Sequence, residues 1–130
     1  FIPQLINSCI RKKKFNTSNG EQLRNFLYID DGINAILKSI KTKKSIGEII
    51  NIGSTKSMKI KKIMILVKNK FRYFDPVYGK IKLRKDEPKI IYPLLRQMKK
   101  ILKFKPKVNF EAGLNRTILF YKRNLSNLNK

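Results

Sequence analysis

The sequence predicts a small mixed α/β unit with about five helices around a few short strands. Apolar residues recur at helical spacing in five segments, and shorter runs rich in β-branched and aromatic side chains have the composition of strands. The chain has 130 residues, of which 42% are apolar. It is therefore expected to fold as one domain with a modest core.

The first helix is predicted at residues 2–10, where Ile2, Leu5, Ile6 and Cys9 share one face. Cys9 is the only cysteine, so disulfides and thiolate metal sites are excluded, and we interpret it as a small core residue. The chain has no histidine, which excludes a Ser-His or Cys-His nucleophilic pair. We therefore expect no metal site.

A strand is predicted at residues 23–29, where aliphatic and aromatic side chains follow a glycine-bearing polar turn. Arg24 lies in this strand, and a guanidinium held on a fixed backbone suits a phosphate. Asp30 or Asp31 is expected to cap the next helix. The apolar face of that helix would comprise Ile33, Ile36, Leu37 and Ile40.

A second, buried strand is predicted at residues 48–53, an apolar run with β-branched side chains. Asn51 lies inside this run, where a polar amide must find hydrogen-bond partners. It could bond to neighbouring backbone or face a ligand at the end of the strand. The residues of the run leave both interpretations open.

Three more helices are predicted in the second half, over residues 60–70, 93–102 and 110–124. Asn109 is expected to cap the last of them, with Gly113 an imperfection in its interior. Between the first two, residues 71–83 read as irregular with a strand near 81–83, and residues 84–88 as an exposed charged turn. Residues 125–130 are predicted to be a frayed tail.

The net charge is +23, carried by 24 lysines and 7 arginines. Lysine, isoleucine and asparagine are all abundant, as an AT-rich coding sequence would produce. The lysines fall on the solvent faces of five helical patterns and do not gather with aromatic side chains. We therefore do not expect nucleic acid as a partner. No apolar run approaches the ~18 residues of a membrane span, so no membrane association is expected.

Residues 20–31 read G-E-Q-L-R-N-F-L-Y-I-D-D. This segment resembles the G-x-Q-x-R-D-F-x-Y-V-D-D signature of extended short-chain dehydrogenases/reductases, the NAD-dependent nucleotide-sugar epimerases, dehydratases and 4-ketoreductases. Residues 47–54 (G-E-I-I-N-I-G-S) are similar to the family's G-E-x-x-N-I-G-S strand. Residues 100–106 and 111–118 are similar to its K-x-L-G-W-x-P and E-x-G-L-x-x-T-I segments. These motifs follow the family's order along nearly the whole chain.

The resemblance implies that residues 1–124 form the nucleotide-sugar-binding C-terminal region, normally appended to a Rossmann domain that is absent here. It implies four substrate-binding residues. Arg24 would contact the diphosphate, Arg84 would lie near the ribose and phosphate, Asn51 would face the nucleotide sugar, and Phe15 would cover the nucleobase.

Parts of the family's machinery are missing. No G-x-x-G-x-x-G loop follows a strand, so NAD or NADP would be bound mainly by the absent half. Tyr78 and Lys82 have the spacing of the catalytic Tyr-x-x-x-Lys pair, but Gly79 and an irregular pattern argue against a helix there, and we interpret the spacing as coincidence. No catalytic residue is assigned, and this part alone should be inactive. Asn25 replaces the family's Asp, so we expect its loop to be held less firmly.

Phe1 leads directly into a helical pattern, so we expect the chain to begin in mid-protein, as a fragment of a cytoplasmic enzyme that is a homodimer when complete. Two alternatives belong to other classes. One is a stand-alone or degenerate module that binds polyphosphates or nucleotides, and the other is a basic RNA-binding protein.

Overall fold

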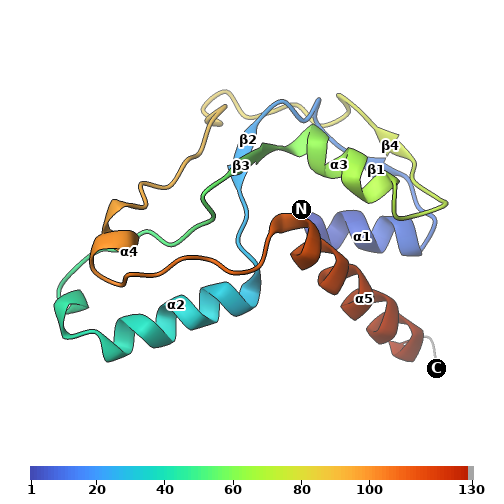
Figure 1. Cartoon of the computed structure of the whole chain (residues 1–130). Coiled ribbons are helices and arrows are strands. Elements are labelled where there is room, and N and C mark those ends of the chain that lie inside the picture. The colour runs from blue at the N-terminus through green and yellow to red at the C-terminus, as the bar shows by residue number, and fades with distance from the viewer. Residues whose placement is uncertain (129–130) are drawn as a thin grey trace.

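The computed structural model describes the backbone of residues 1–128 and the side chains of residues 1–124. The elements in chain order are α1 (Ile2–Ile10), β1 (Phe15–Asn16), β2 (Leu23–Asn25), α2 (Ile29–Lys41), the short 3-10 helix η1 (Lys43–Ser45), β3 (Ser57–Lys59), α3 (Ile60–Lys68), β4 (Pro76–Val77), α4 (Arg96–Lys100) and α5 (Phe110–Leu128). The mixed α/β prediction is confirmed, and Figure 1 shows the helices arranged in two groups on either side of β2 and β3.

The buried side chains form two separate clusters, which match these two groups. The larger cluster lies among α1, α3 and α5, and comprises Leu5, Ile6, Cys9, Ile60, Ile63, Met64, Val67, Leu114 and Ile118. The smaller cluster lies between α2 and the α4 region, and comprises Ala35, Leu95, Met98, Leu102 and Phe104. The predicted core role of Cys9 is confirmed, and its burial raises the pKa of the thiol.

The strands form two short sheets. β1 pairs with β4 in parallel, and β2 pairs with β3 antiparallel with Arg24 opposite Met58. The strand predicted at residues 23–29 is shorter than expected, because β3 offers only three residues for pairing and the ladder ends at Asn25. The strand predicted at 81–83 is wrong, since the strand of that region is β4 and lies earlier in the chain.

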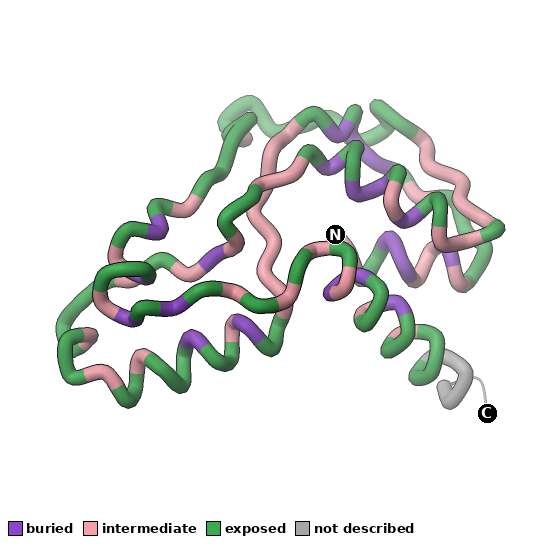
Figure 2. The backbone as a smooth tube through the Cα atoms, in the orientation of Figure 1, coloured by how far each residue is buried: buried purple, intermediate pink, exposed green. Residues whose placement is uncertain are grey.

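The α2 helix forms as its periodicity predicts, but its apolar face is not buried in the described part of the chain. Ile33, Ile36, Leu37 and Ile40 are all exposed, and Ile40 retains 75% of its accessible surface. The α2 residue that belongs to the smaller cluster is instead Ala35. Figure 2 shows most of α2 as exposed tube along the edge of the molecule. The periodicity therefore predicted the helix correctly, but the face that it predicted to be buried is exposed.

Asp31 is buried and connects α2 by hydrogen bonds to the segment before α5. It does not cap α2. Its carboxylate accepts hydrogen bonds from the backbone N–H groups of Lys107 (3.0 and 3.1 Å) and Val108 (2.8 Å). The N-cap residue of α2 is Tyr28, and no side chain bonds to the helix start. The predicted capping role is therefore wrong. Asp31 fixes α2 to the segment that leads into α5.

The buried strand predicted at residues 48–53 is not formed. Among the described residues, no backbone hydrogen bond involves residues 49–53, and Ile49 is 85% exposed. A strand needs a neighbour to pair with, and none of the described segments lies in register beside this one. The segment has the composition of a strand, but no described segment forms backbone hydrogen bonds with it.

The C-terminal half follows the predicted order with shifted boundaries. α4 begins at Arg96, later than the predicted start at Pro93. α5 is capped as predicted, because the Oδ1 atom of Asn109 accepts a hydrogen bond from the N–H of Ala112 at 2.8 Å. A Cβ atom at Gly113 would lie 3.0 Å from a ring carbon of Tyr28, so this glycine permits close packing and is not an imperfection.

The last helix reaches into the predicted tail. α5 continues to Leu128, and residues 129–130 of the tail predicted at 125–130 lie outside the described residues. Within the described part of the chain, no helix has the length and apolar character needed to cross a membrane. Nor do the described residues contain a group of His, Cys, Asp and Glu that could hold a metal ion.

The two faces of α3 allow a matched test of the larger cluster. Ile63 is fully buried, whereas Ile65 on the same helix is 48% exposed. We expect Ile63→Ala to lower the free energy of unfolding by about 2–5 kcal/mol, because it leaves a cavity. Ile65→Ala should lower it by less than about 1 kcal/mol. Urea unfolding followed by circular dichroism measures both, and equal losses would contradict this packing.

Candidate functional site

A cleft of about 570 Å³ lies beside β1 and β2. Its lining residues come from the start of α1, from β1, from the loop before β2, from β2 itself and from residues 81–87. Phe15, Arg24 and Arg84, which the sequence assigns to a substrate site, all line this cleft although they lie far apart in the chain. The fold therefore brings three of the four assigned residues together.

The backbone of β2 is held on both edges. On one edge it pairs with β3. On the other, the N–H of Leu23 donates to the carbonyl of Lys89 at 2.8 Å, and the N–H of Ile91 donates to the carbonyl of Leu23 at 3.1 Å. Arg24 thus extends from a strand whose position is fixed on both sides, as the sequence predicts. The same contacts bring the charged turn at residues 84–88 next to Arg24.

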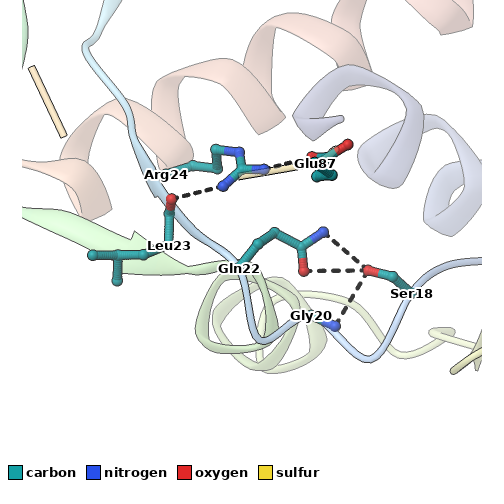
Figure 3. A network of polar contacts seen from close by, with 6 residues as sticks. All are labelled: Ser18, Gly20, Gln22, Leu23, Arg24 and Glu87. Carbon is teal, nitrogen blue, oxygen red and sulfur yellow. Dashed lines mark hydrogen bonds and ion pairs between the residues drawn. The ribbon is translucent and has the colours of Figure 1, made fainter. Parts of the chain in front are cut away.

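The guanidinium of Arg24 forms an ion pair with Glu87, with Nη2 and Oε1 2.5 Å apart, and Nη1 donates to the carbonyl of Leu23 at 2.9 Å (Figure 3). The Arg24 side chain is 17% exposed, and Arg24 is among the residues that line the cleft. Sequence reasoning placed Glu87 in an exposed turn and missed this contact. The only feature of the sequence that could have indicated this ion pair is that Glu87 is an acidic residue three positions after Arg84.

A polar network shapes the loop before β2 (Figure 3). The Ser18 hydroxyl accepts hydrogen bonds from the Gln22 amide at 3.0 Å and from the N–H of Gly20 at 3.3 Å. Gly20 has a φ of +74°, and a Cβ atom there would lie 2.8 Å from the backbone nitrogen of Lys61. That N–H donates to the Gly20 carbonyl at 2.8 Å. Only glycine fits, and the loop is thereby anchored to α3.

Asn25 ties β2 to the chain that follows residue 53. Its Oδ1 accepts from the N–H of Ser54 at 2.8 Å, and its Nδ2 donates to the Ser54 carbonyl at 2.8 Å and to the Ser57 hydroxyl at 3.2 Å. An ionised aspartate at this position could accept the first bond but could not donate the others. The expectation of a less firmly held loop is therefore wrong, because the amide supplies bonds that suit this arrangement.

The other assigned residues differ in their placement. Arg84 is exposed at the rim of the cleft, and Phe15 stacks edge-on against Phe1 with ring centroids 5.9 Å apart. Asn51 is exposed and does not line the cleft, so its role stays a prediction. Tyr78 and Lys82 lie in a segment that is not helical, in agreement with the interpretation of their spacing as coincidence.

One carboxyl group near the cleft has a perturbed pKa. Lys59 donates a hydrogen bond to Glu21 at 2.8 Å, and this bond together with the lysine charge lowers the pKa of Glu21. The stabilising effect of the pair is present at neutral pH and is lost as the pH falls through the lowered pKa. Both side chains are exposed, so salt screens the interaction.

The described residues do not fit a dinucleotide cofactor. A dinucleotide site needs a strand that passes through a glycine-rich turn into a helix, whose N-terminus then receives the pyrophosphate. Here β3 runs directly into α3, and the connection from β2 to α2 contains no glycine. The basic side chains that line the cleft suit an anionic ligand.

Comparison with known proteins shows the family of this chain. A sequence model of the NAD dependent epimerase/dehydratase family matches residues 1–53. The dTDP-D-glucose 4,6-dehydratase of Mus musculus is 32% identical over 97% of this chain and 37% of its own length. The UDP-glucuronate 4-epimerase of Thermodesulfobacterium geofontis is 30% identical over 82% of this chain and 32% of its own length.

A solved structure shows the same fold. The UDP-glucuronic acid 4-epimerase from Bacillus cereus, in complex with UDP-glucuronic acid and NAD, matches with a TM-score of 0.84 and 27% identity, covering 94% of this chain and 39% of that one. The chain belongs to the NAD-dependent epimerase/dehydratase family of extended short-chain dehydrogenases/reductases. It spans between 30% and 37% of the length of the curated relatives named first among its matches.

The hydrogen bonds of Asn25 predict that the aspartate of the family signature is unfavourable in this chain. We expect Asn25→Asp to lower the free energy of unfolding at neutral pH by about 1–3 kcal/mol, because its carboxylate faces the Ser54 carbonyl without a donor. The loss should shrink below about pH 4, where the carboxyl group is protonated and can donate. Asn115→Asp, on the exposed surface of α5, is the matched control. Equal thermal stability of the two variants would contradict this account.

Proposed function

We propose that this chain is the substrate-binding part of an NAD(P)-dependent nucleotide-sugar epimerase, dehydratase or 4-ketoreductase, and that it holds the diphosphate of the nucleotide sugar. The observation that carries the proposal is the shared cleft of Arg24, Arg84 and Phe15. Two guanidinium groups suit phosphate oxygens, and an aromatic ring suits a nucleobase. The relatives' printed ligands, UDP-glucuronic acid among them, support the same class of ligand.

Arg24 would carry the main diphosphate contact. Its strand is paired on both edges, so little conformational freedom is lost when a ligand binds. Arg84, at the exposed rim, would approach the ribose and phosphate. Binding of this kind acts equally on substrate and transition state, so it orients the sugar and does not itself perform the chemistry.

The cofactor and the acid/base group would come from the remainder of the enzyme. The relatives are about three times as long as the matched region, and an apolar surface of this chain is left without a covering. That surface comprises Ile36, Leu37 and Ile40 on α2 together with Ile46 and Ile49, which are 82% and 85% exposed. We propose that the cofactor-binding part packs here and pairs with residues 48–53.

Asn51 is part of this proposal. It is exposed in a segment without backbone partners, and pairing of that segment would fix the direction of its side chain. We assign it a contact with the nucleotide sugar that forms only when the strand is completed. For the complete enzyme we further propose a homodimer in the cytoplasm.

Nucleotide-sugar binding by Arg24 can be tested with a matched pair of arginines. We expect Arg24→Ala to weaken binding of UDP-glucuronic acid or dTDP-glucose at least about tenfold, because a charge-assisted contact is lost. Arg96→Ala removes an exposed arginine of α4 outside the cleft and should leave affinity unchanged. Isothermal titration calorimetry on the 130-residue chain measures both.

Unchanged affinity in Arg24→Ala would contradict the diphosphate assignment. The RNA-binding alternative has its own signature, which is binding of single-stranded RNA with a steep salt dependence while nucleotide sugars do not bind. A stand-alone polyphosphate-binding module would bind inorganic triphosphate as tightly as a nucleotide sugar.

The unpaired strand makes a prediction for amide hydrogen exchange. In the isolated chain, the amides of residues 49–53 should exchange without protection, because none of them is hydrogen-bonded. The amides of Ile60 and Lys61, which bond to the loop before β2, serve as the protected reference. Protection of residues 49–53 in the isolated chain would show that the segment has found a partner in this chain or in a second copy.

A further inference from the structure

Two pockets outside the cleft meet at Lys107, and lysines line both of them. One pocket, of about 350 Å³, lies among residues 54–58, Lys62 and the start of α5. The other, of about 440 Å³, lies between α2 and the segment that leads into α5, which runs beside α2 in Figure 1. We call the two pockets together the lysine groove. Its lysines, all exposed, are Lys38, Lys56, Lys62, Lys103, Lys105 and Lys107.

The positive charge of the lysine groove is not neutralised within the described part of the chain. None of the six lysines forms an ion pair with a described residue. Asp31 is the only acidic residue among the described ones that line the groove, and its carboxylate already accepts hydrogen bonds from the N–H groups of Lys107 and Val108. Six lysines and one aspartate give the lining a net charge of +5.

The groove is also partly apolar. Five half-buried apolar residues line the pocket beside α5, namely Phe26, Met58, Pro106, Val108 and Phe110. The two phenylalanine rings pack edge to face with centroids 5.8 Å apart, and both rest against the larger cluster. This pocket therefore offers apolar surface with lysines around it, which is a different combination from a solvated row of lysines on a helix.

The lysine groove is separate from the two surfaces already assigned. It shares only Phe26 with the cleft of Arg24. On α2, Ile36 and Ile40 belong to the exposed apolar face, and each is two positions from Lys38. At about 100° per residue, Lys38 lies on nearly the opposite side of the helix. A domain that packs on the apolar face of α2 would therefore leave this part of the groove open.

We propose that the lysine groove is a docking site for an acidic peptide segment of another protein, which places an apolar side chain in the pocket beside α5 and its carboxylates against the lysines. A phosphate chain would match the charge but leave the apolar lining unfilled. Single-stranded nucleic acid needs exposed rings for its bases to stack on, and here the rings pack against the cluster. Lysine ammonium groups on flexible stems suit carboxylates at varied positions.

The test compares two pairs of lysines. Lys105→Gln/Lys107→Gln removes two charges of the groove, and Lys43→Gln/Lys44→Gln removes two equally exposed charges of η1, outside both pockets. The probe is a fluorescein-labelled peptide in which glutamates flank a central phenylalanine. Fluorescence anisotropy with the full 130-residue chain, at physiological salt, measures its affinity. We expect the groove pair to weaken binding about threefold to tenfold, and the η1 pair by less than about twofold.

A second peptide, with alanine in place of the phenylalanine, tests the apolar pocket. We expect it to bind the wild-type chain about threefold to tenfold more weakly, because the buried ring is lost. Equal losses in the two lysine pairs, or no binding of the first peptide, would overturn the proposal. Tighter binding of inorganic polyphosphate or of single-stranded oligonucleotide than of the peptide, lost in Lys105→Gln/Lys107→Gln, would overturn it in favour of that ligand.

This inference and the proposed function fail separately. Lys105 and Lys107 lie outside the cleft, so UDP-glucose affinity should be the same in Lys105→Gln/Lys107→Gln as in the wild-type chain. Arg24→Ala should in turn leave peptide affinity unchanged. Loss of peptide binding in Arg24→Ala would show that the peptide occupies the cleft, and would overturn the docking site without touching the assignment of Arg24.

Discussion

The pairing of β2 with neighbours on both edges is the constraint on which the rest of the structure depends. β3 pairs with all three residues of β2 on one side, and residues 89–91 bond to Leu23 on the other, so three distant parts of the chain meet at this strand. The pairing orients Arg24, brings Glu87 to it, and places Asn25 where it holds the segment after residue 53. Because backbone hydrogen bonds are directional, this short ladder fixes the cleft more firmly than side-chain packing alone would.

The two hydrophobic clusters have different degrees of completeness. The larger one is enclosed by α1, α3 and α5. The smaller one buries one side of α2 and leaves the isoleucines and leucine of another side exposed. Asp31 compensates in part, because its buried hydrogen bonds to Lys107 and Val108 tie α2 to the chain without apolar contact. The exposed apolar face of α2 and the segment at residues 49–53, which has no backbone hydrogen bonds in the described part of the chain, lie in the same region of the molecule.

The cleft of this chain is lined by Arg24, Arg84 and Phe15, whereas the described residues contain no glycine-rich strand–turn–helix of the kind that binds a dinucleotide. The remote part of a substrate can supply binding energy that orients the reacting part.

Local features were determined by the sequence alone. Helices α1, α2, α3 and α5 and the cap at Asn109 follow from spacing and from residue chemistry within a few positions. Features that need a distant partner were decided only by the tertiary structure. Residues 48–53 read as a strand but have no neighbour, the apolar face of α2 finds no core, and Glu87 reaches Arg24 only because residues 89–91 pair with β2. Periodicity shows that a surface is apolar, but what covers it depends on segments that no local pattern can specify.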